Sequence, residues 1–159
     1  MNRRDALPRP VTRAVSLDRL MAAVVVVHFV VAGVHGVAHV GAGVALTAAQ
    51  LVFVVVVITA APVYGLYRHY RGPGAQGAAI LVASMAASLV FGWIFHFVAD
   101  TPDDVAQVEP DVVGAWARTF ASSAYAVAGI ELLGTLLAVA LLRSALSPRR
   151  PRRRRPNAR

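Results

Sequence analysis

Three histidines lie close together in a strongly apolar stretch, HFVVAGVHGVAHV at residues 28–40. His35 and His39 are four residues apart, and His28 precedes His35 by seven. At about 100° per residue, these steps place all three imidazoles on one face of a helix, within roughly 20° of one line. Two histidines at a spacing of four can converge on one metal ion or haem iron, so this face is a candidate ligand site.

Two further ionisable residues stand in apolar surroundings. His96 lies in GWIFHFVAD and Glu131 lies in AVAGIELLGTLLAV. An ionised carboxylate alone in hydrocarbon costs roughly 2.5 kcal/mol or more, so Glu131 must be protonated or paired. Ionisable groups in such segments are candidates for functional sites.

The composition determines which elements must position these residues. The chain has 159 residues, of which 57% are hydrophobic and 15% charged, with a formal net charge of +8. This balance is typical of a membrane protein rather than of a soluble domain. The sequence has no cysteine, which excludes disulfides, thiolate metal ligands and cysteine-held iron–sulfur clusters.

Four apolar segments are each long enough to cross about 30 Å of hydrocarbon as a helix, which takes roughly 20 residues. We expect spans near 20–40, 44–67, 77–99 and 119–142. The expected fold is therefore all-α: a polytopic integral membrane protein with one domain, 20–142, built as a four-helix bundle. Pro62 is expected to kink the second span.

The flanking charges predict the direction of the spans. Arginines precede the first span, lie between the second and third at Arg68 and Arg71, and follow the fourth, whereas the loop at 100–112 carries only acids. The positive-inside rule then places both termini in the cytoplasm and the acidic loop outside, in a multi-pass protein of the plasma (cytoplasmic) membrane. Arg118, just before the fourth span, is the exception, and it can reach the outer interface or pair with Asp111.

The two ends of the chain are expected to be peripheral. The segment 1–19 is predicted to be a basic cytoplasmic N-terminal segment. A cleavable signal peptide is the less favoured alternative, because the apolar stretch that follows is long and contains His28. The Arg/Pro-rich segment 143–159 is expected to be disordered and to contact anionic lipid headgroups. Nucleic acid is an unlikely partner, since no aromatic or folded platform accompanies these arginines.

Depth along the spans divides the polar residues into two levels. At about 1.5 Å per residue, His35, His39 and His96 lie roughly 8, 13 and 12 Å above the midplane on the outer side. We therefore predict a metal or haem site ligated by these three histidines. The residues expected to support it, at the same height or in the loop above, are Gln50, Tyr125, Asp100, Asp103 and Asp104.

The deeper level consists of His28 and Glu131, about 3 Å below the midplane and within about 1 Å of it. These residues can pair if the first and fourth spans are neighbours. Such a pair could relay protons or bind an ion, or it could be a polar clasp that fixes helix order. His69 reads as exposed and structural.

Small residues indicate which helices meet. On the first span, the histidine face also carries the small residues Ala32 and Gly36. On the third span, small side chains form a stripe at Ser84, Ser88 and Gly92. Such stripes let helices approach closely, so these two faces are expected to be in contact.

In outline the pattern resembles two kinds of four-helix membrane protein, the small His-ligated b-type cytochromes and the small proton-coupled exporters. Helix number and scattered His or Glu are all that match, so no residue is carried over. Phosphate-binding glycine loops, nucleophile elbows and HExxH helices are lacking, and VHGVAH has no Glu beside its first His.

Three functions follow as alternatives. The leading hypothesis is an outer-leaflet site for copper, zinc, iron or haem b, in redox chemistry or metal handling. The second is a proton-coupled small transporter or channel that uses His28 and Glu131. The third is an accessory or structural subunit of a larger membrane complex or homo-oligomer. No enzymatic activity is assigned.

Overall fold

The computed structural model describes residues 16–109 and 113–147, and all regular structure within them is helical. The described residues leave out most of the basic N-terminal segment, Asp111 and the tail from residue 148. In chain order the elements are α1 (Leu17–Gly41), α2 (Ala48–Phe53), η1 (Val54–Ala60), α3 (Ala61–Arg71), α4 (Gly74–Phe97) and α6 (Ala115–Leu146).

Four helical rods are long and apolar enough to cross a membrane, which confirms the all-α expectation with four candidate spans. Three of the rods are α1, α4 and α6, and the fourth consists of α2, η1 and α3, which follow one another without a break from residue 48 to 71. The chain is thus a multi-pass membrane protein by the length and composition of its helices.

The helix ends differ from the expected ends by a few residues. The second rod starts at residue 48 rather than 44, because Thr47 and Gln50 form a capping box: the Thr47 hydroxyl accepts from the Gln50 amide, and the Gln50 side chain accepts from the Thr47 amide. A hydropathy profile cannot locate a helix N-cap, so the predicted span began too early. The last helix runs from residue 115 to 146, so residues 143–146, expected in a disordered tail, are helical.

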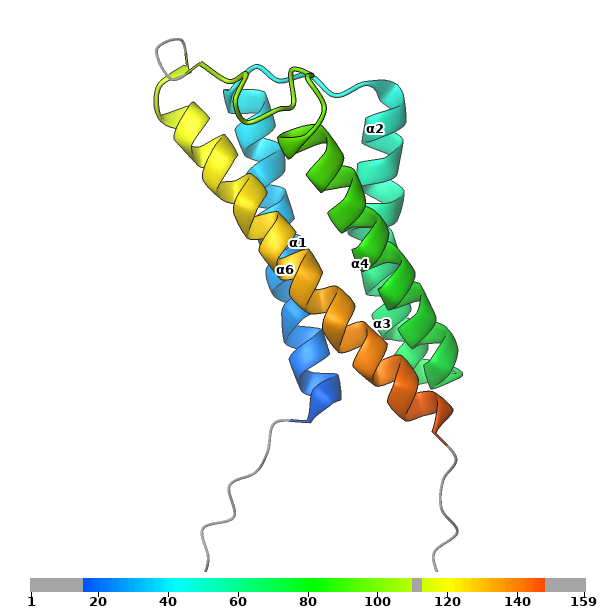
Figure 1. Cartoon of the computed structure of the whole chain (residues 1–159). Helices are drawn as coiled ribbons and strands as arrows, with labels where there is room; N and C mark the ends of the chain where they lie inside the picture. The colour runs from blue at the N-terminus through cyan, green and yellow to red at the C-terminus, as the bar shows by residue number, and fades with distance from the viewer. Residues whose placement is uncertain (1–15, 110–112, 148–159) are drawn as a thin grey trace, which may run out of the picture.

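The helices pack in a fixed order of neighbours (Figure 1). α6 packs on both α1 and α4 and crosses in front of α1 in this view, while α4 also packs on α3. α1 begins and α6 ends at the same end of the bundle, the lower end in Figure 1. The first, third and fourth spans therefore enclose a common interior.

The outer surface of the bundle is apolar on every rod. Large hydrophobic side chains point outward from α1, α4 and α6, for example Val40, Val90 and Leu136. A helix that is hydrophobic all round is either buried in a large core or spans a membrane. In a chain of this size, the exposed apolar surface favours the membrane.

Two apolar clusters bracket a polar layer. The first contains Met21, Val24, Val25, Ala78, Leu81, Met85, Ala138 and Leu141. The second, at the opposite end of α1 and α6, contains Ala38, Val44, Val108, Ala117 and Phe120. His28 and His35 on α1 and Glu131 on α6 lie between the two clusters along their helices.

Close helix approach occurs at other glycines than expected. A Cβ built on Gly77 would lie 2.2 Å from the backbone nitrogen of His69, and one on Gly41 would lie 2.2 Å from the Trp116 ring. Gly36, by contrast, has nothing within 4 Å of its Cβ position. The expectation that Gly36 forms a close helix contact is therefore wrong, and it borders an internal cavity instead.

Pro62 lies directly after a π-helical segment of the second rod. It lies in the first turn of α3, directly after the π-helix η1, whose Thr59 hydroxyl donates to the Val54 carbonyl at 2.9 Å. Proline lacks an amide proton and its ring crowds the carbonyl four residues earlier. A π-helical stretch before it widens the backbone, and such stretches are frequent at functional sites.

His69 is less exposed than expected. Its Nε2 lies 3.0 Å from Asp18 Oδ1, its Nδ1 lies 3.1 Å from the Gly74 carbonyl oxygen, and the neighbouring Tyr70 hydroxyl donates to the Asp18 carbonyl at 2.9 Å. The side chain of His69 is only 13% exposed. The expectation of exposure is wrong, because this imidazole joins the end of α3 to the start of α1.

Candidate metal centre

Three histidines from two helices meet at the end of the polar layer nearest the acidic loop. α1 supplies His35 and His39, and His96 comes from the last turn of α4. One ring nitrogen of each lies within 4.8 Å of the others, and all three side chains are buried. This His triad could hold a metal ion, and it is formed by the three residues that the sequence pattern selected.

An aromatic ring from a third helix closes one side of the triad. Phe120 of α6 is fully buried, and its ring centroid lies 5.1 Å from that of His35, 4.9 Å from His39 and 5.6 Å from His96. Packing of this kind restricts the imidazoles to a few orientations. Phe120 thus packs against all three imidazoles and helps to hold them together.

The outward-facing nitrogens of two imidazoles have fixed partners. His96 Nδ1 lies 2.8 Å from the carbonyl oxygen of Asp103, which can only accept, so Nδ1 carries the proton. His35 Nδ1 lies 2.9 Å from Ser123 Oγ, whose own proton is directed to the Thr119 carbonyl at 2.6 Å. His35 Nδ1 is therefore also a donor. Partners of this kind set the tautomer of metal-binding histidines.

The two inward-facing nitrogens consequently present lone pairs to each other. His35 Nε2 and His96 Nε2 are 3.1 Å apart. Two acceptors at this distance repel unless a proton or another cation lies between them. In a tetrahedral site with bonds of about 2.0–2.1 Å, ligand nitrogens are about 3.3–3.4 Å apart. The observed spacing is close to one edge of such a tetrahedron.

The same geometry does not fit haem b. Axial histidines bind haem iron from opposite faces of the macrocycle, which then lies between their rings. Here the His35 and His96 rings are edge-to-face with centroids 4.8 Å apart, and the adjoining cavity is about 70 Å³. No room for a macrocycle remains between them, so the haem alternative is not supported.

A buried carboxylate from the acidic loop lies beside the triad. Asp103 Oδ1 is 3.8 Å from His39 Nδ1, and Asp103 Oδ2 accepts from Gln50 Nε2 at 2.7 Å. His39 Nδ1 also lies 3.4 Å from the Val44 carbonyl oxygen. Gln50 and Asp103 thus occupy supporting positions next to the triad, and Asp103 brings a negative charge close to it.

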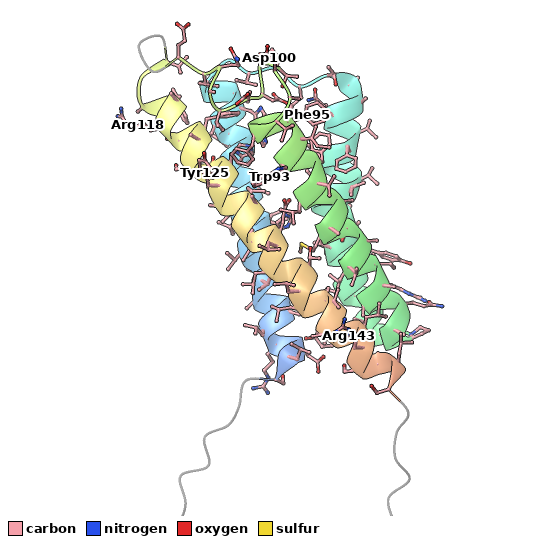
Figure 2. The ribbon with its side chains drawn as sticks, in the orientation of Figure 1. Trp93, Phe95, Asp100, Arg118, Tyr125 and Arg143 are labelled. Carbon is pink, nitrogen blue, oxygen red and sulfur yellow. The ribbon has the colours of Figure 1, made fainter. Side chains whose placement is uncertain are left out.

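The other expected supporting residues lie elsewhere. Asp100 is exposed and accepts from Gln107, and Asp104 accepts from the Ala106 amide. Tyr125 is 61% exposed and stacks on Phe97 at 4.8 Å, away from the triad. Figure 2 shows Asp100 in the loop above the bundle and Tyr125 on α6. Height alone suggested these residues, but height says nothing about which way a side chain points.

The predicted contact between His28 and Glu131 is also present. His28 of α1 and Glu131 of α6 are 2% and 1% exposed, and His28 Nε2 lies 3.2 Å from Glu131 Oε1. The pairing follows from the contact between α1 and α6. It leaves Glu131 Oε2 buried without a hydrogen-bond partner.

Sequence reasoning missed three residues of the polar layer, Ser123, Phe120 and the partner-free Ser88 hydroxyl. The sequence pattern indicates Ser88 only as a small residue for helix packing. Ser123 lies two positions before Tyr125, and the same depth estimate would have placed it near His35. The contact of α6 with α1 decides that Ser123, and not Tyr125, faces the triad.

Comparison of the chain with protein-family models, with curated proteins and with solved structures found no match.

Proposed function

We propose that this chain is a multi-pass membrane protein that binds a transition-metal cation at His35, His39 and His96 and acts in metal handling. One observation carries the proposal: two Nε2 atoms lie 3.1 Å apart while both Nδ1 positions are occupied by fixed oxygen partners. A cation shared by the lone pairs removes their repulsion.

Zn²⁺ is the cation that the donor set fits best. Three neutral imidazoles and one open position are a common zinc arrangement, and zinc readily adopts tetrahedral geometry. Copper and iron also accept imidazole, so they are alternatives in the test. The nearby Asp103 carboxylate supports a divalent ion, because a buried positive charge requires a compensating one.

We further propose that the triad lies in the outer leaflet of a cytoplasmic membrane, with both termini inside. The support is the distribution of charge: Arg143 lies at one end of the bundle, and Asp100 lies at the other (Figure 2). Arginine-rich flanks favour the cytoplasmic side, where they also contact anionic lipid. Arg118, at the acidic end, is exposed and can extend to the interface.

Elemental analysis of the full-length protein, purified from metal-replete cells, tests the metal centre. We expect about one zinc per chain, by the single-ion geometry, and its loss in the His35→Ala/His39→Ala variant. His69→Ala is the matched control, because it removes an imidazole outside the triad. Metal-free wild-type protein, or equal metal in the double variant, would overturn the proposal and favour an accessory subunit.

A second candidate function, proton-coupled transport, is favoured by the buried His28–Glu131 pair, since one carboxylate oxygen has no partner. Flux driven by a proton gradient should be lost in Glu131→Gln. Wild-type flux in that variant would exclude this candidate while leaving the metal centre untouched.

A further inference from the structure

The triad and Glu131 border a common space between the helices. A cavity of about 70 Å³ is lined by all three histidines of the triad and by Asp103, and at its deeper end by Ser88 and Glu131. One water needs roughly 10–15 Å³ of such space, so the cavity has room for water-sized occupants. The two polar levels are therefore connected inside the bundle.

Two buried oxygens at the deeper end have no partner. Among the described residues, Glu131 Oε2 and Ser88 Oγ are the buried side-chain polar atoms that make no hydrogen bond. Buried polar atoms in folded proteins are nearly always satisfied. Two such atoms lining one cavity indicate that the cavity has a polar or charged occupant.

Gly92 keeps the space between the levels open. A Cβ built on this residue would lie 3.8 Å from His96 Cδ2 and 3.9 Å from Glu131 Oε2. Both are ordinary contact distances, so an alanine fits without displacing either group. The added methyl group would nevertheless occupy the position between the triad and the carboxylate.

We propose that Glu131 Oε2 and Ser88 Oγ form a second binding level for the metal cation, which moves between it and the triad through this cavity. The inference rests on the proposed metal centre, which supplies the ion. His28 contacts Glu131 Oε1 and so orients the carboxylate, leaving Oε2 toward the cavity. Each level then has one carboxylate, Asp103 at the outer level and Glu131 at the deeper level.

The occupant is a cation rather than water alone because of the charge and donor set. A carboxylate oxygen and a hydroxyl oxygen are ligands for divalent ions, and the triad provides nitrogen ligands at the other end of the same cavity. A cation leaving the triad meets a compensating carboxylate without crossing the apolar clusters. The bundle thus assigns the ion a path inward from the outer level.

Zinc uptake by proteoliposomes containing the full-length protein tests this path, with bound zinc measured on the same samples. We expect Glu131→Gln and Ser88→Ala to retain zinc at the triad while uptake falls, by about tenfold or more for Glu131→Gln. Gly92→Ala should also lower uptake and keep the bound zinc. Gly129→Ala is its matched control, since a Cβ there has nothing within 4 Å.

The outcomes separate the two proposals. Absence of bound zinc in the wild-type protein would overturn the metal centre. Bound zinc with no wild-type uptake, or uptake unchanged in both Ser88→Ala and Glu131→Gln, would overturn the second level and leave the centre standing. If Glu131→Gln does not fold, Ser88→Ala and the Gly92→Ala/Gly129→Ala comparison decide the question.

Discussion

At the scale of single residues, the candidate centre depends on what lies behind each imidazole. The Nδ1 atoms of His35 and His96 are held by Ser123 and by the Asp103 carbonyl, and this leaves Nε2 free for a ligand. Loss of such partners typically lowers metal affinity by about 10- to 100-fold. They therefore give a sharper test than removal of a histidine.

We predict that Ser123→Ala weakens metal binding by about 10- to 100-fold without abolishing it, because His35 loses the partner that sets its tautomer. Titration of the apo-protein with zinc measures the change. Ser122→Ala is the control, since Ser122 is exposed one position away. Equal affinities for the two variants would show that Ser123 does not orient His35.

The His28–Glu131 pair makes a separate prediction about stability. His28→Leu leaves a buried Glu131 without its partner, which should cost about 3–5 kcal/mol in the free energy of unfolding. The His28→Leu/Glu131→Leu double variant should be more stable than the single variant, because it removes the unpaired carboxyl as well. Thermal unfolding in detergent compares them, and additive losses in the double variant would contradict the pairing.

At the scale of helices, the centre depends on how closely neighbouring rods can approach. α4 contacts α3 through Gly77, whose missing side chain lets the His69 backbone come near. α1 and α6 meet where Trp116 covers Gly41. These contacts set the positions of α1 and α4, which carry the ligands.

Gly77→Ala should therefore destabilise the bundle by about 1–3 kcal/mol or more, since the new methyl group would overlap the backbone of α3. Gly33→Ala, where nothing lies within 4 Å, should instead be neutral or slightly stabilising, because alanine favours helix. Melting temperatures in the same detergent test the pair. Similar values for both variants would show that the α3–α4 contact is not tight.

At the scale of the whole molecule, the charge distribution predicts the orientation and the apolar surface favours a membrane. Arg143 and Asp100 lie at opposite ends of the bundle, and the positive-inside rule predicts that the end with Arg143 faces the cytoplasm. The native chain has no cysteine, which makes single-cysteine labelling unambiguous.

We predict that an impermeant maleimide labels Ala106→Cys in intact cells and labels Gln76→Cys only after the membrane is permeabilised. Both positions are exposed, one in the acidic loop and one near the start of α4. The reverse pattern would invert the topology and place the triad in the inner leaflet. The cysteine-free wild-type protein provides the background signal.

The sequence by itself determined the four apolar rods, because span length and hydropathy are local properties of the chain. It also indicated that His28, His35 and His39 share a face, since helical periodicity follows from spacing. It could not show that α1 and α4 each pack on α6 rather than closely on each other, that Ser123 rather than Tyr125 faces the triad, or that Gly36 borders a cavity. Those features depend on side-chain packing between helices distant in sequence, and the tertiary structure alone decided them.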